Sequence, residues 1–508
     1  MMTRSVEKQS RLLAVTMEEL IPQDHFLRKL DAAISFDFVY DIVAPLYSAQ
    51  GRPSVDPVIL VKMLLLGHLY GIDPERKLAE EVRYNIAYRW YLGLDLDEAT
   101  PDHSTFSQDR RRRFKGQAVF RQIFDQIVAK CWEAGLVKGE SVVMDSTHIK
   151  ANADTHNNVT IEVTRRPEAY WDDLDQTVLP EETIEKVKNP CDPDAGHMDR
   201  TGKPKGFHYL DHQCSDADTG IILDISVTGG DVQDCECCVE RYRYLKEEQH
   251  YPIRFAGLDS GYDTIRIHYG LTRLGITPYI RPCRRGKRKE SKWLTKDDFI
   301  WVAEENKFIC PDGKKLLFQW VSRPKNGSPI LTYAAQESDC SNCRFRAKCF
   351  APKRRRRELI RKVFSEYQDA GRLRVGTAPY RQILRKRQIV CEGNFGLQKR
   401  CHNLRSTRKR GIENVEEQCL LSACALNLKR LIRGMNLIKI PSVDQAGIRP
   451  DPTRNHQFLL RFLELAETIR TVSAILFPKG DLSTDPRCRN DDMGLYPMPG
   501  VTWCTQSS

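Results

Sequence analysis

The chain has 508 residues, which is too long for one hydrophobic core and predicts about three or four folding units. Hydrophobic residues make up 41% and charged residues 29%, a balance that excludes a disordered chain. The longest apolar run, Val58–Leu66, is far shorter than the ~20 residues that cross a bilayer, so no membrane partner is expected.

The net charge of +11 is unevenly distributed. Basic residues cluster in four runs, namely Arg110–Lys115, Arg281–Lys292, Lys353–Lys362 and Lys399–Arg410. Each run alone fits a solvated surface, but the four together indicate a polyanionic partner.

The 17 cysteines are irregularly spaced, and the N-terminus has no apolar stretch of signal-peptide type. An odd count without an export signal argues against a disulfide framework and for a reducing compartment. We therefore expect a cytoplasmic protein, in which a compact cysteine cluster indicates a metal site.

Residues 1–135 have the periodicity of helices. Asp56-Pro57 is typical of a helix start and Gly71 of its end. Asp73 and the proline after it predict a second helix that continues through Trp90.

Ser104 is a plausible cap for a third helix, and a fourth is expected around Phe120–Cys131. The third helix carries four consecutive arginines, Arg110, Arg111, Arg112 and Arg113. Short helices with an arginine-rich member suit a helix-turn-helix-like DNA reader, although an ordinary helical bundle has the same pattern.

After Gly139 strands alternate with helices, which predicts an α/β layer. The expected strands are Ser141–Met144, Ile221–Val227, Ile253–Leu258 and Thr277–Ile280. A helix is expected at Val232–Leu245, and Asp263 could cap another. The polar stretch Ala151–Lys205 is a long excursion without an assigned shape.

Arg284–Tyr380 breaks the α/β rhythm. Helical periodicity returns at Arg381–Cys401 and Ile412–Ile432, and once more at Gln457–Ile475 in the C-terminal tail.

Three carboxylates are candidates for metal-ion catalysis on phosphodiesters, which needs acidic side chains held together on a rigid frame. Asp145 and Asp259 each follow an apolar strand, and strand ends are where α/β sheets gather ligands. Glu392 lies on the helix after Arg381. Arg385, Glu392 and Lys399 are seven residues, or about two turns, apart and share one face of that helix, and Asn403 falls on the same stripe.

Each candidate also has an ordinary interpretation. Asp145 and Asp259 could be loop or capping aspartates, and the stripe around Glu392 could be a surface salt-bridge ladder.

The segments taken together resemble the DDE transposases of bacterial insertion sequences, specifically the family numbered 1182, over roughly residues 20–435. The motifs that carry the resemblance are Gly51–Pro57, Arg83–Asn85, Pro101–Phe106, Asp145–Thr147, Asp259–Tyr262, Glu392–Gly396 and Asn427–Arg430. Their order and spacing along one chain are more specific than any single motif.

The resemblance implies a ribonuclease-H-like mixed-sheet core with the first catalytic Asp on the first strand, the second after the fourth strand, and the Glu on a later helix. These roles fall on Asp145, Asp259 and Glu392, with two magnesium or manganese ions. Lys399 matches the spacing of the family's lysine. Gln388 stands where some relatives have an arginine, and Arg387 or Arg385 is expected to take its place, although Arg385 stands where the family often has a tyrosine. The partners implied are double-stranded DNA and further copies of the chain, in a bacterial, nucleoid-associated enzyme.

We expect five segments along the chain. They are a helical DNA-binding domain (1–135), the first part of the core (136–283), a cysteine-containing insertion (284–380), the second part of the core with the catalytic Glu (381–436) and a tail (437–508).

The insertion contains Cys340-x-x-Cys343 with Cys349 close behind, and Cys310 could add a fourth thiolate. Four thiolates suit a structural tetrahedral zinc, and the alternative is ordinary reduced thiols. The crowded Cys235, Cys237 and Cys238 are expected to be unpaired thiols instead.

The expected function is DDE transposition: binding of terminal inverted repeats, cleavage at the element ends and joining of the 3′ hydroxyls to target DNA. One alternative is a repurposed DNA-binding protein without activity. The other is a metal-dependent nuclease that does not join strands.

Overall fold

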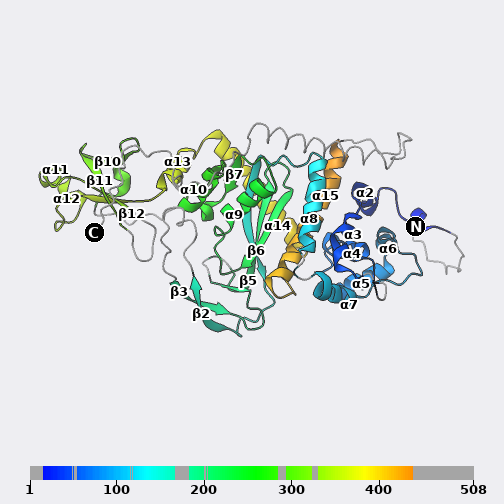
Figure 1. The fold of residues 1–508 in the computed structure, drawn as a ribbon. Helices are drawn as coiled ribbons and strands as arrows, with labels where there is room; N and C mark the ends of the chain where they lie inside the picture. Colours follow the sequence, from blue (N-terminus) through cyan, green and yellow to red (C-terminus); the bar gives the residue numbers. More distant parts are fainter. Residues whose placement is uncertain are drawn as a thin grey trace, which may run out of the picture. The chain divides into compact units, whose positions relative to one another are not determined.

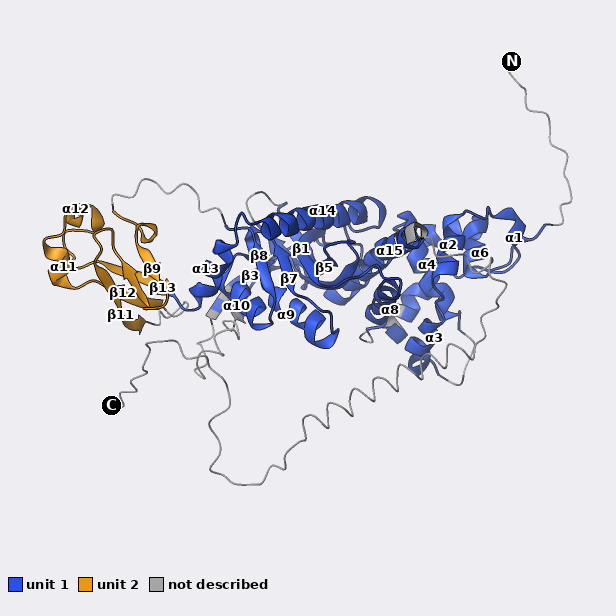
Figure 2. Cartoon of the chain, turned by 90° about the horizontal axis from the view of Figure 1, so that it is seen from above, with its two compact units in different colours: residues 1–288, 362–438 blue, residues 289–361, 439–508 orange. Residues whose placement is uncertain are grey.

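A computed structural model describes residues 15–438, apart from 49, 51–53, 115, 117, 166–181, 200, 201, 203, 284–292 and 323–329. The chain divides into two compact units. Unit 1 comprises Met1–Arg288 and Lys362–Ile438, and the described part of unit 2 lies within Lys289–Arg361 (Figure 2). The helix expected at Gln457–Ile475 lies outside the described residues.

The N-terminal part of unit 1 is helical (Figure 1). Its helices are α1 (Met17–Leu20), α2 (Phe26–Ala33), α3 (Phe38–Val43), the 3₁₀ turn η1 (Ala44–Leu46), α4 (Pro57–Tyr70), α5 (Glu75–Tyr84), α6 (Ile86–Leu92), α7 (His103–Asp109), the π-turn η2 (Arg110–Phe114) and α8 (Val119–Glu133). The starts and ends predicted for α4 are confirmed: Asp56 accepts from the backbone N–H of Val58, and Gly71 ends the helix at φ 71°.

Two helix predictions in this part were wrong in detail. The second helix breaks at Asn85, whose side chain accepts from the N–H groups of Ala87 and Tyr88 and so starts α6 as a separate helix. Ser104 lies inside α7 and donates its backbone N–H to Asp102, and the arginine run forms a π-turn after that helix.

The core of unit 1 is a six-stranded mixed sheet. Its strands are β1 (Ser141–Lys150), β4 (Gly196–Met198), β5 (Gly206–Asp216), β6 (Ile222–Gly229), β7 (Phe255–Leu258) and β8 (Thr277–Ile280). The order is β4-β5-β1-β7-β8, with β6 paired to β5. β1 is antiparallel to β5 but parallel to β7, and β7 is parallel to β8.

The polar excursion contains β2 (Val159–Arg165) and β3 (Glu182–Lys188), which form a separate antiparallel pair, followed by β4 and β5. β5 is buried along its whole length and is the central antiparallel partner of β1. No strand was predicted there, because its polar residues His208, Asp211, His212 and Gln213 hide the apolar character of a core strand.

Helices cover both faces of this sheet (Figure 2). They are α9 (Cys238–Arg243) with the π-turn η4 (Tyr244–Glu248), the 3₁₀ turn η5 (Ser260–Tyr262), α10 (Ile265–Arg273), α13 (Ser365–Leu373), α14 (Ala378–Cys401) and α15 (Ile412–Ile438). α14 lies along one face against β1, β5, β7 and β8, and α9 and α10 lie along the other. The helix predicted from Val232 starts six residues later, and Thr264, not Asp263, caps α10.

α15 connects the sheet to the N-terminal helices, because it packs against β6 on one side and α2, α4 and α8 on the other. Asn427 fixes this docking by donating to the carbonyl of Ile222 and accepting from its N–H, both at 2.9 Å. Arg430 binds the carbonyl of Gly220 and the side chain of Asn394. The Asn427–Arg430 motif therefore has a structural role.

Unit 2 has its own five-stranded sheet, in which β9, β10, β11 and β12 pair antiparallel, and a small core. Its elements are η6 (Lys296–Asp298), β9 (Ile300–Val302), β10 (Lys307–Ile309), β11 (Lys315–Ser322), β12 (Ile330–Ala334), α11 (Glu337–Ser341), α12 (Arg346–Cys349) and β13 (Glu358–Lys362). Phe308, Leu316 and Tyr333 are the most buried side chains of this core.

No single helix in the described ranges has the length and hydropathy of a membrane span. Only α4 and α5 taken together, which meet at 99°, reach that composition.

Candidate active site

One register pair places two aspartates side by side. The parallel ladder between β1 and β7 ends at Val143 opposite Gly257. Asp145 and Asp259 each follow two residues after that pair. The prediction that Asp145 lies at a strand end was wrong, because β1 continues to Lys150 against β5 after β7 has ended. The two aspartates nevertheless share the edge where the parallel ladder stops.

Asp145 is a carboxylate that the fold holds at an electrostatic cost. Burial raises its pKa to about 6, and the nearby carboxylate of Asp259 adds to the effect, whereas Arg387 opposes it. The backbone N–H of Ser146 donates to it at 2.9 Å. Two neighbouring carboxylates in a partly buried place repel each other, so a cation bound between them stabilises their ionised forms.

Arg387 of α14 supplies part of this stabilising positive charge. Its guanidinium lies 2.6 Å from the Asp145 carboxylate and 3.6 Å from that of Asp259. The Arg387 side chain is 12% exposed, and its Nε has no hydrogen-bond partner among the described residues. A cationic group thus already occupies the space between the two carboxylates.

Close packing holds α14 at this edge. A Cβ on Gly257 would lie 2.7 Å from Ile383 of α14 and 3.0 Å from Val143 of β1, so only glycine lets the helix approach. Farther along, Asn394 donates to the hydroxyl of Ser215, and Gln213 donates to Gln398. These buried polar contacts set the rotation of α14 over the sheet.

Glu392 lies on α14 directly after Cys391, a buried thiol. Burial raises the pKa of Cys391, and the nearby charges of Asp145, Asp259 and Glu392 add to this. Glu392 is exposed and forms no hydrogen bond or ion pair within the described part of the chain. The structure therefore places Glu392 at the solvent side of the helix, beside the aspartates but not in contact with them.

The stripe predicted around Glu392 is only partly formed. Arg385 lies exposed on the helix, and Lys399 lies over β5, where its charge acts on the buried Asp211. Asn403 follows the end of α14 and donates to the carbonyl of Gly67, so it is not on the stripe. Arg387, not Arg385, is the arginine that reaches the aspartates.

Asp263, four residues after Asp259, is hydrogen-bonded both to the segment that precedes unit 2 and to the segment that follows it. Its carboxylate accepts from the N–H of Cys283 at 3.0 Å and from the side chain of Gln368 at 2.9 Å, and it lies 3.1 Å from His268. These contacts lower the pKa of Asp263 to about 2 against the effect of burial. Cys283 precedes unit 2 and Gln368 follows it.

The predicted DNA-binding arginines differ in their surroundings. Arg113 binds Asp109 and the hydroxyl of Ser54, and its guanidinium stacks on Tyr47. Arg112 is exposed. The side chains of Arg110 and Arg111 lie outside the described residues.

The four cysteines named for zinc do come together in unit 2. Cys310, Cys340, Cys343 and Cys349 line one cavity of about 20 Å³. Burial raises the pKa of Cys349 to about 11, and the three neighbouring thiols add to it. Even so, no three His, Cys, Asp or Glu side chains in the described ranges, here or at Asp145, are close enough to coordinate one metal ion as they stand.

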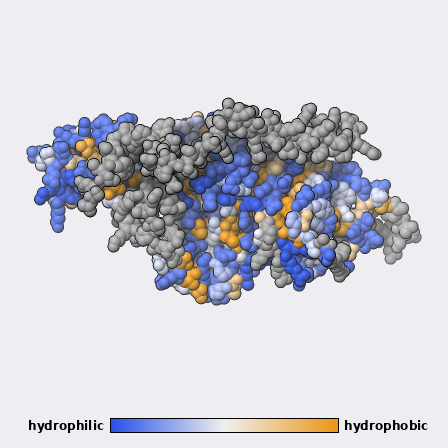
Figure 3. Space-filling view, viewed as in Figure 1, coloured by the Kyte–Doolittle hydropathy of each residue, from blue (hydrophilic) through white to orange (hydrophobic). Residues whose placement is uncertain are grey.

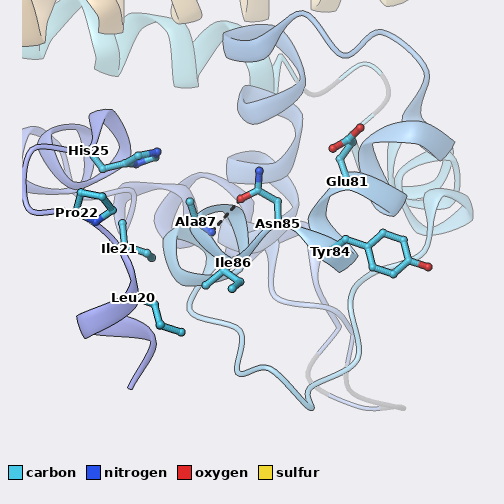
Figure 4. A pocket seen from close by; sticks show the side chains of 9 residues that line it. All are labelled: Leu20, Ile21, Pro22, His25, Glu81, Tyr84, Asn85, Ile86 and Ala87. Carbon is cyan, nitrogen blue, oxygen red and sulfur yellow. Dashed lines mark hydrogen bonds between the residues drawn. The ribbon is translucent and has the colours of Figure 1, made fainter. Parts of the chain in front are cut away.

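A larger cavity, of about 560 Å³, opens among the N-terminal helices beside Tyr84 and Asn85 (Figure 4). Its lining combines apolar side chains with the polar groups of His25, Tyr84 and Asn85, and Glu81 is the one acid among the lining residues. It therefore does not supply the grouped carboxylates that metal-ion catalysis needs.

Two family models match the chain. Residues 15–112 match the model described as "Transposase domain (DUF772)", and residues 309–432 match the one described as "Transposase DDE domain". The second match includes Glu392 and Lys399, whereas neither match includes Asp145 or Asp259.

A solved structure, piggyBac transposase in a synaptic complex with hairpin DNA, is similar over 84% of this chain and 85% of that chain. The identity is 9% and the TM-score 0.25. A likeness at that TM-score does not establish a shared fold, so the assignment of this chain rests on the two sequence matches.

Proposed function

Because the chain belongs to the DDE transposases, we propose that it binds the inverted repeats of its own element, cleaves phosphodiester bonds at the element ends and joins the 3′ hydroxyls to target DNA. The observation that carries this proposal is the placement of Asp145 and Asp259, each two residues beyond the last residue pair, Val143 and Gly257, of the parallel β1–β7 ladder. Membership in the family numbered 1182 stays a prediction.

The sheet supports a ribonuclease-H-like core. Its long strands have the order β6-β5-β1-β7-β8, with the first three antiparallel and the last three parallel. In chain order, Asp145 lies on the first of these strands, β1, and Asp259 follows directly after the fourth, β7, which is the arrangement that the family resemblance implies. Glu392 on the long helix α14 would complete the catalytic set.

Asp145, Asp259 and Glu392 are the residues that would hold magnesium or manganese. Their oxygen donors fit hard divalent ions, and the paired aspartates already attract the guanidinium of Arg387. Such ions, when bound by carboxylates, supply charge stabilisation for in-line attack on a phosphodiester. Glu392 has to turn toward the aspartates to join them, and its exposed position on α14 leaves its side chain this freedom.

The basic residues of α14 would bind the DNA backbone. Arg387 would exchange a carboxylate for a substrate phosphate, since its planar guanidinium binds both anions in the same way. Lys399 and Arg385 would contact phosphates farther along the helix. Arg112 would do so from the N-terminal helices, which we propose recognise the inverted repeats, with at least two copies of the chain bridging the two ends.

Unit 2 would hold a structural zinc. Its four cysteines face one cavity from two segments of the chain, and thiolates select zinc over magnesium. Elemental analysis of protein made with zinc present should give one zinc per chain, and Cys340→Ser with Cys343→Ser should remove it. Zinc content that does not change in this double variant would contradict the site.

Cleavage of end DNA in magnesium tests the catalytic set. Asp145→Ala, Asp259→Ala and Glu392→Ala should each abolish cleavage and leave DNA binding in a gel-shift largely intact. Glu240→Gln, an exposed acid on α9, is the matched control and should cleave normally. A near-normal rate in any of the three alanine variants removes that residue from the site.

Strand transfer separates the rival functions. Wild-type protein that cleaves the ends but never joins them to a target plasmid is a nuclease. Protein that binds the ends and does not cleave them in magnesium or manganese is a repurposed DNA-binding protein. Arg112→Ala should weaken binding to the ends, and unchanged affinity would exclude that arginine from the contact.

A further inference from the structure

The turn that carries Asp259 is short and only partly buried. Its backbone closes on itself, because the N–H of Tyr262 donates to the carbonyl of Asp259 at 3.2 Å and the N–H of Asp263 donates to that of Ser260 at 3.3 Å. The N–H of Gly261 donates to the Asp259 carboxylate at 2.7 Å, and this side chain is 38% exposed. A closed turn moves as one piece, so the contacts of its last residue also position its first.

Asp263 ties this turn to other elements. Among the described residues, the hydrogen bonds that join residues 260–263 to another element all involve Asp263. One carboxylate oxygen accepts from the N–H of Cys283 at 3.0 Å, and the other accepts from Gln368 at 2.9 Å and lies 3.1 Å from the ring of His268. The same Gln368 amide donates to the backbone carbonyl of Asp263 at 3.0 Å. The side chain and the backbone of this residue are thus both held.

The Asp263 carboxylate is ionised in spite of its burial. Its side chain is 5% exposed, and that of His268 is 3% exposed. A buried carboxylate stays ionised only where hydrogen bonds replace its hydration. Burial alone would raise the pKa of Asp263, but the bonds from His268, Cys283 and Gln368 lower it to about 2. The hydrogen bonds of this anchor are therefore charge-assisted, which makes them stronger than bonds between neutral groups.

Close packing holds the donor on α13 in place. A Cβ on Gly371 would lie 2.4 Å from the ring of His268, so a side chain there would push α13 away from α10. Phe364, which directly precedes α13, stacks on Tyr269 of α10 with ring centroids 4.3 Å apart. Gln368 lies between these two contacts, so its amide reaches Asp263 from a helix that is fixed on both sides of it.

We propose that Asp263 is a positioning residue for the metal-ion site, because it anchors the turn that presents Asp259 to α13 and to the segment after β8. The proposal rests on the transposase function proposed above. It adds to that function a residue outside the three-carboxylate set, which acts through Asp259 and is not a ligand itself. Without the anchor, the Asp259 carboxylate is present but loosely held, so the ion binds more weakly.

Calorimetric titration of the full chain with Mn²⁺ measures ion binding without an activity assay. In Asp263→Asn one carboxylate oxygen becomes an amide N–H₂ group, which cannot accept from the N–H of Cys283. The Kd for Mn²⁺ should rise about tenfold, the lower end of the effect of losing a partner that orients a metal ligand. Asp369→Asn is the matched control: it removes the same charge from the residue next to Gln368, where Asp369 pairs with Arg372 at 3.4 Å, and it should bind Mn²⁺ as wild type does.

Gln368→Leu is a second variant, which keeps the carboxylate and removes only its bonds to α13. It should weaken Mn²⁺ binding in the same direction, and it decides the question if Asp263→Asn does not fold. In cleavage assays both variants should need more magnesium for the half-maximal rate and recover at high magnesium, with unchanged affinity for end DNA. A purely structural role would lower the Tm and leave the Kd for Mn²⁺ of the folded protein unchanged.

A wild-type Kd for Mn²⁺ in the folded variants, with binding weakened in Asp145→Asn, overturns this inference alone. If wild type itself neither binds Mn²⁺ nor cleaves end DNA, the transposase function proposed above is wrong, and the positioning role of Asp263 is wrong with it.

Discussion

At the scale of single residues, Arg387 and Asp145 balance each other. The arginine is a fixed cation between two acids, and the acid is held where its ionised form is disfavoured. Such a site lowers the stability of the ligand-free protein, because charged groups that are placed to bind a ligand repel one another until the ligand is bound.

Removing the arginine should destabilise the protein. Arg387→Gln leaves two neighbouring carboxylates without a cation, and we expect a loss of about 2–4 kcal/mol in the free energy of unfolding. Added magnesium should then raise the Tm of the variant more than that of wild type, because the ion no longer competes with a guanidinium. Thermal unfolding with EDTA and with magnesium measures both effects. An equal increase in Tm on adding magnesium in the two proteins would exclude this competition between the ion and the guanidinium.

Asp145 predicts a pH-dependent stability. Its folded pKa of about 6 lies above the ~3.9 of an unfolded aspartate, so the folded state holds the proton more tightly. Stability is therefore lost as the pH rises from about 4 to about 6 and stays low above that.

Asp145→Asn removes this loss. We expect it to stabilise the protein by about 2–3 kcal/mol at pH 8 and to have almost no effect at pH 4. Urea unfolding of both proteins in EDTA across this range checks the prediction. A difference that is constant with pH would show that the carboxyl does not titrate as its burial implies.

At the scale of elements, the contact between α14 and the β1–β7 ladder positions the site. Gly257→Ala adds one methyl group where Ile383 and Val143 leave no room, so α14 has to move away from Asp259. We expect a loss of about 1–3 kcal/mol and slower cleavage, although no functional group is removed.

Gly393→Ala on α14 is the matched control for this prediction. A Cβ at Gly393 has no neighbour within 4 Å, so alanine should stabilise the helix by about 0.5–1 kcal/mol and leave cleavage unchanged. Equal behaviour of the two variants in urea unfolding and cleavage would show that the close approach at Gly257 does not matter.

The same elements show which parts of the fold and the site can be predicted from the sequence. The apolar runs before Asp145 and Asp259, and the caps of α4, could be recognised because local patterns determine them. β5 could not, since its polar residues point into a buried network with Gln398 and Asn394 that forms only when α14 packs on the sheet.

At the scale of the whole molecule, the excess charge is concentrated in one unit. Residues 289–361 contain 17 Lys and Arg against 9 Asp and Glu, a net charge of +8 out of the +11 of the chain. The visible described surface of this unit is mainly hydrophilic (Figure 3). Unit 2 is therefore expected to contact DNA phosphates as well as to hold zinc.

The salt dependence of DNA binding tests this expectation. Lys353, Arg354 and Arg355 are exposed and form no ion pair within the described residues. Replacing all three by serine should weaken DNA binding and reduce the slope of log K against log salt by about 2–3, near 0.9 per phosphate contact.

The control replaces three lysines of unit 1 that already pair with acids, namely Lys130, Lys138 and Lys205. The net charge changes by the same amount, and the slope should stay near that of wild type. Equal slopes for the two triple variants would show that net charge alone, rather than unit 2, determines the binding.

The contacts of Asp263 have a consequence for how this protein could acquire or exchange a domain. The segment before unit 2 and the segment after it are both hydrogen-bonded to one carboxylate, at Cys283 and Gln368. A grafted sequence of any length that starts and finishes at these points leaves the catalytic sheet unstretched. The two ends that a replacement has to join are held near each other by the side chains of Asp263 and Gln368, whatever the size of the domain it carries.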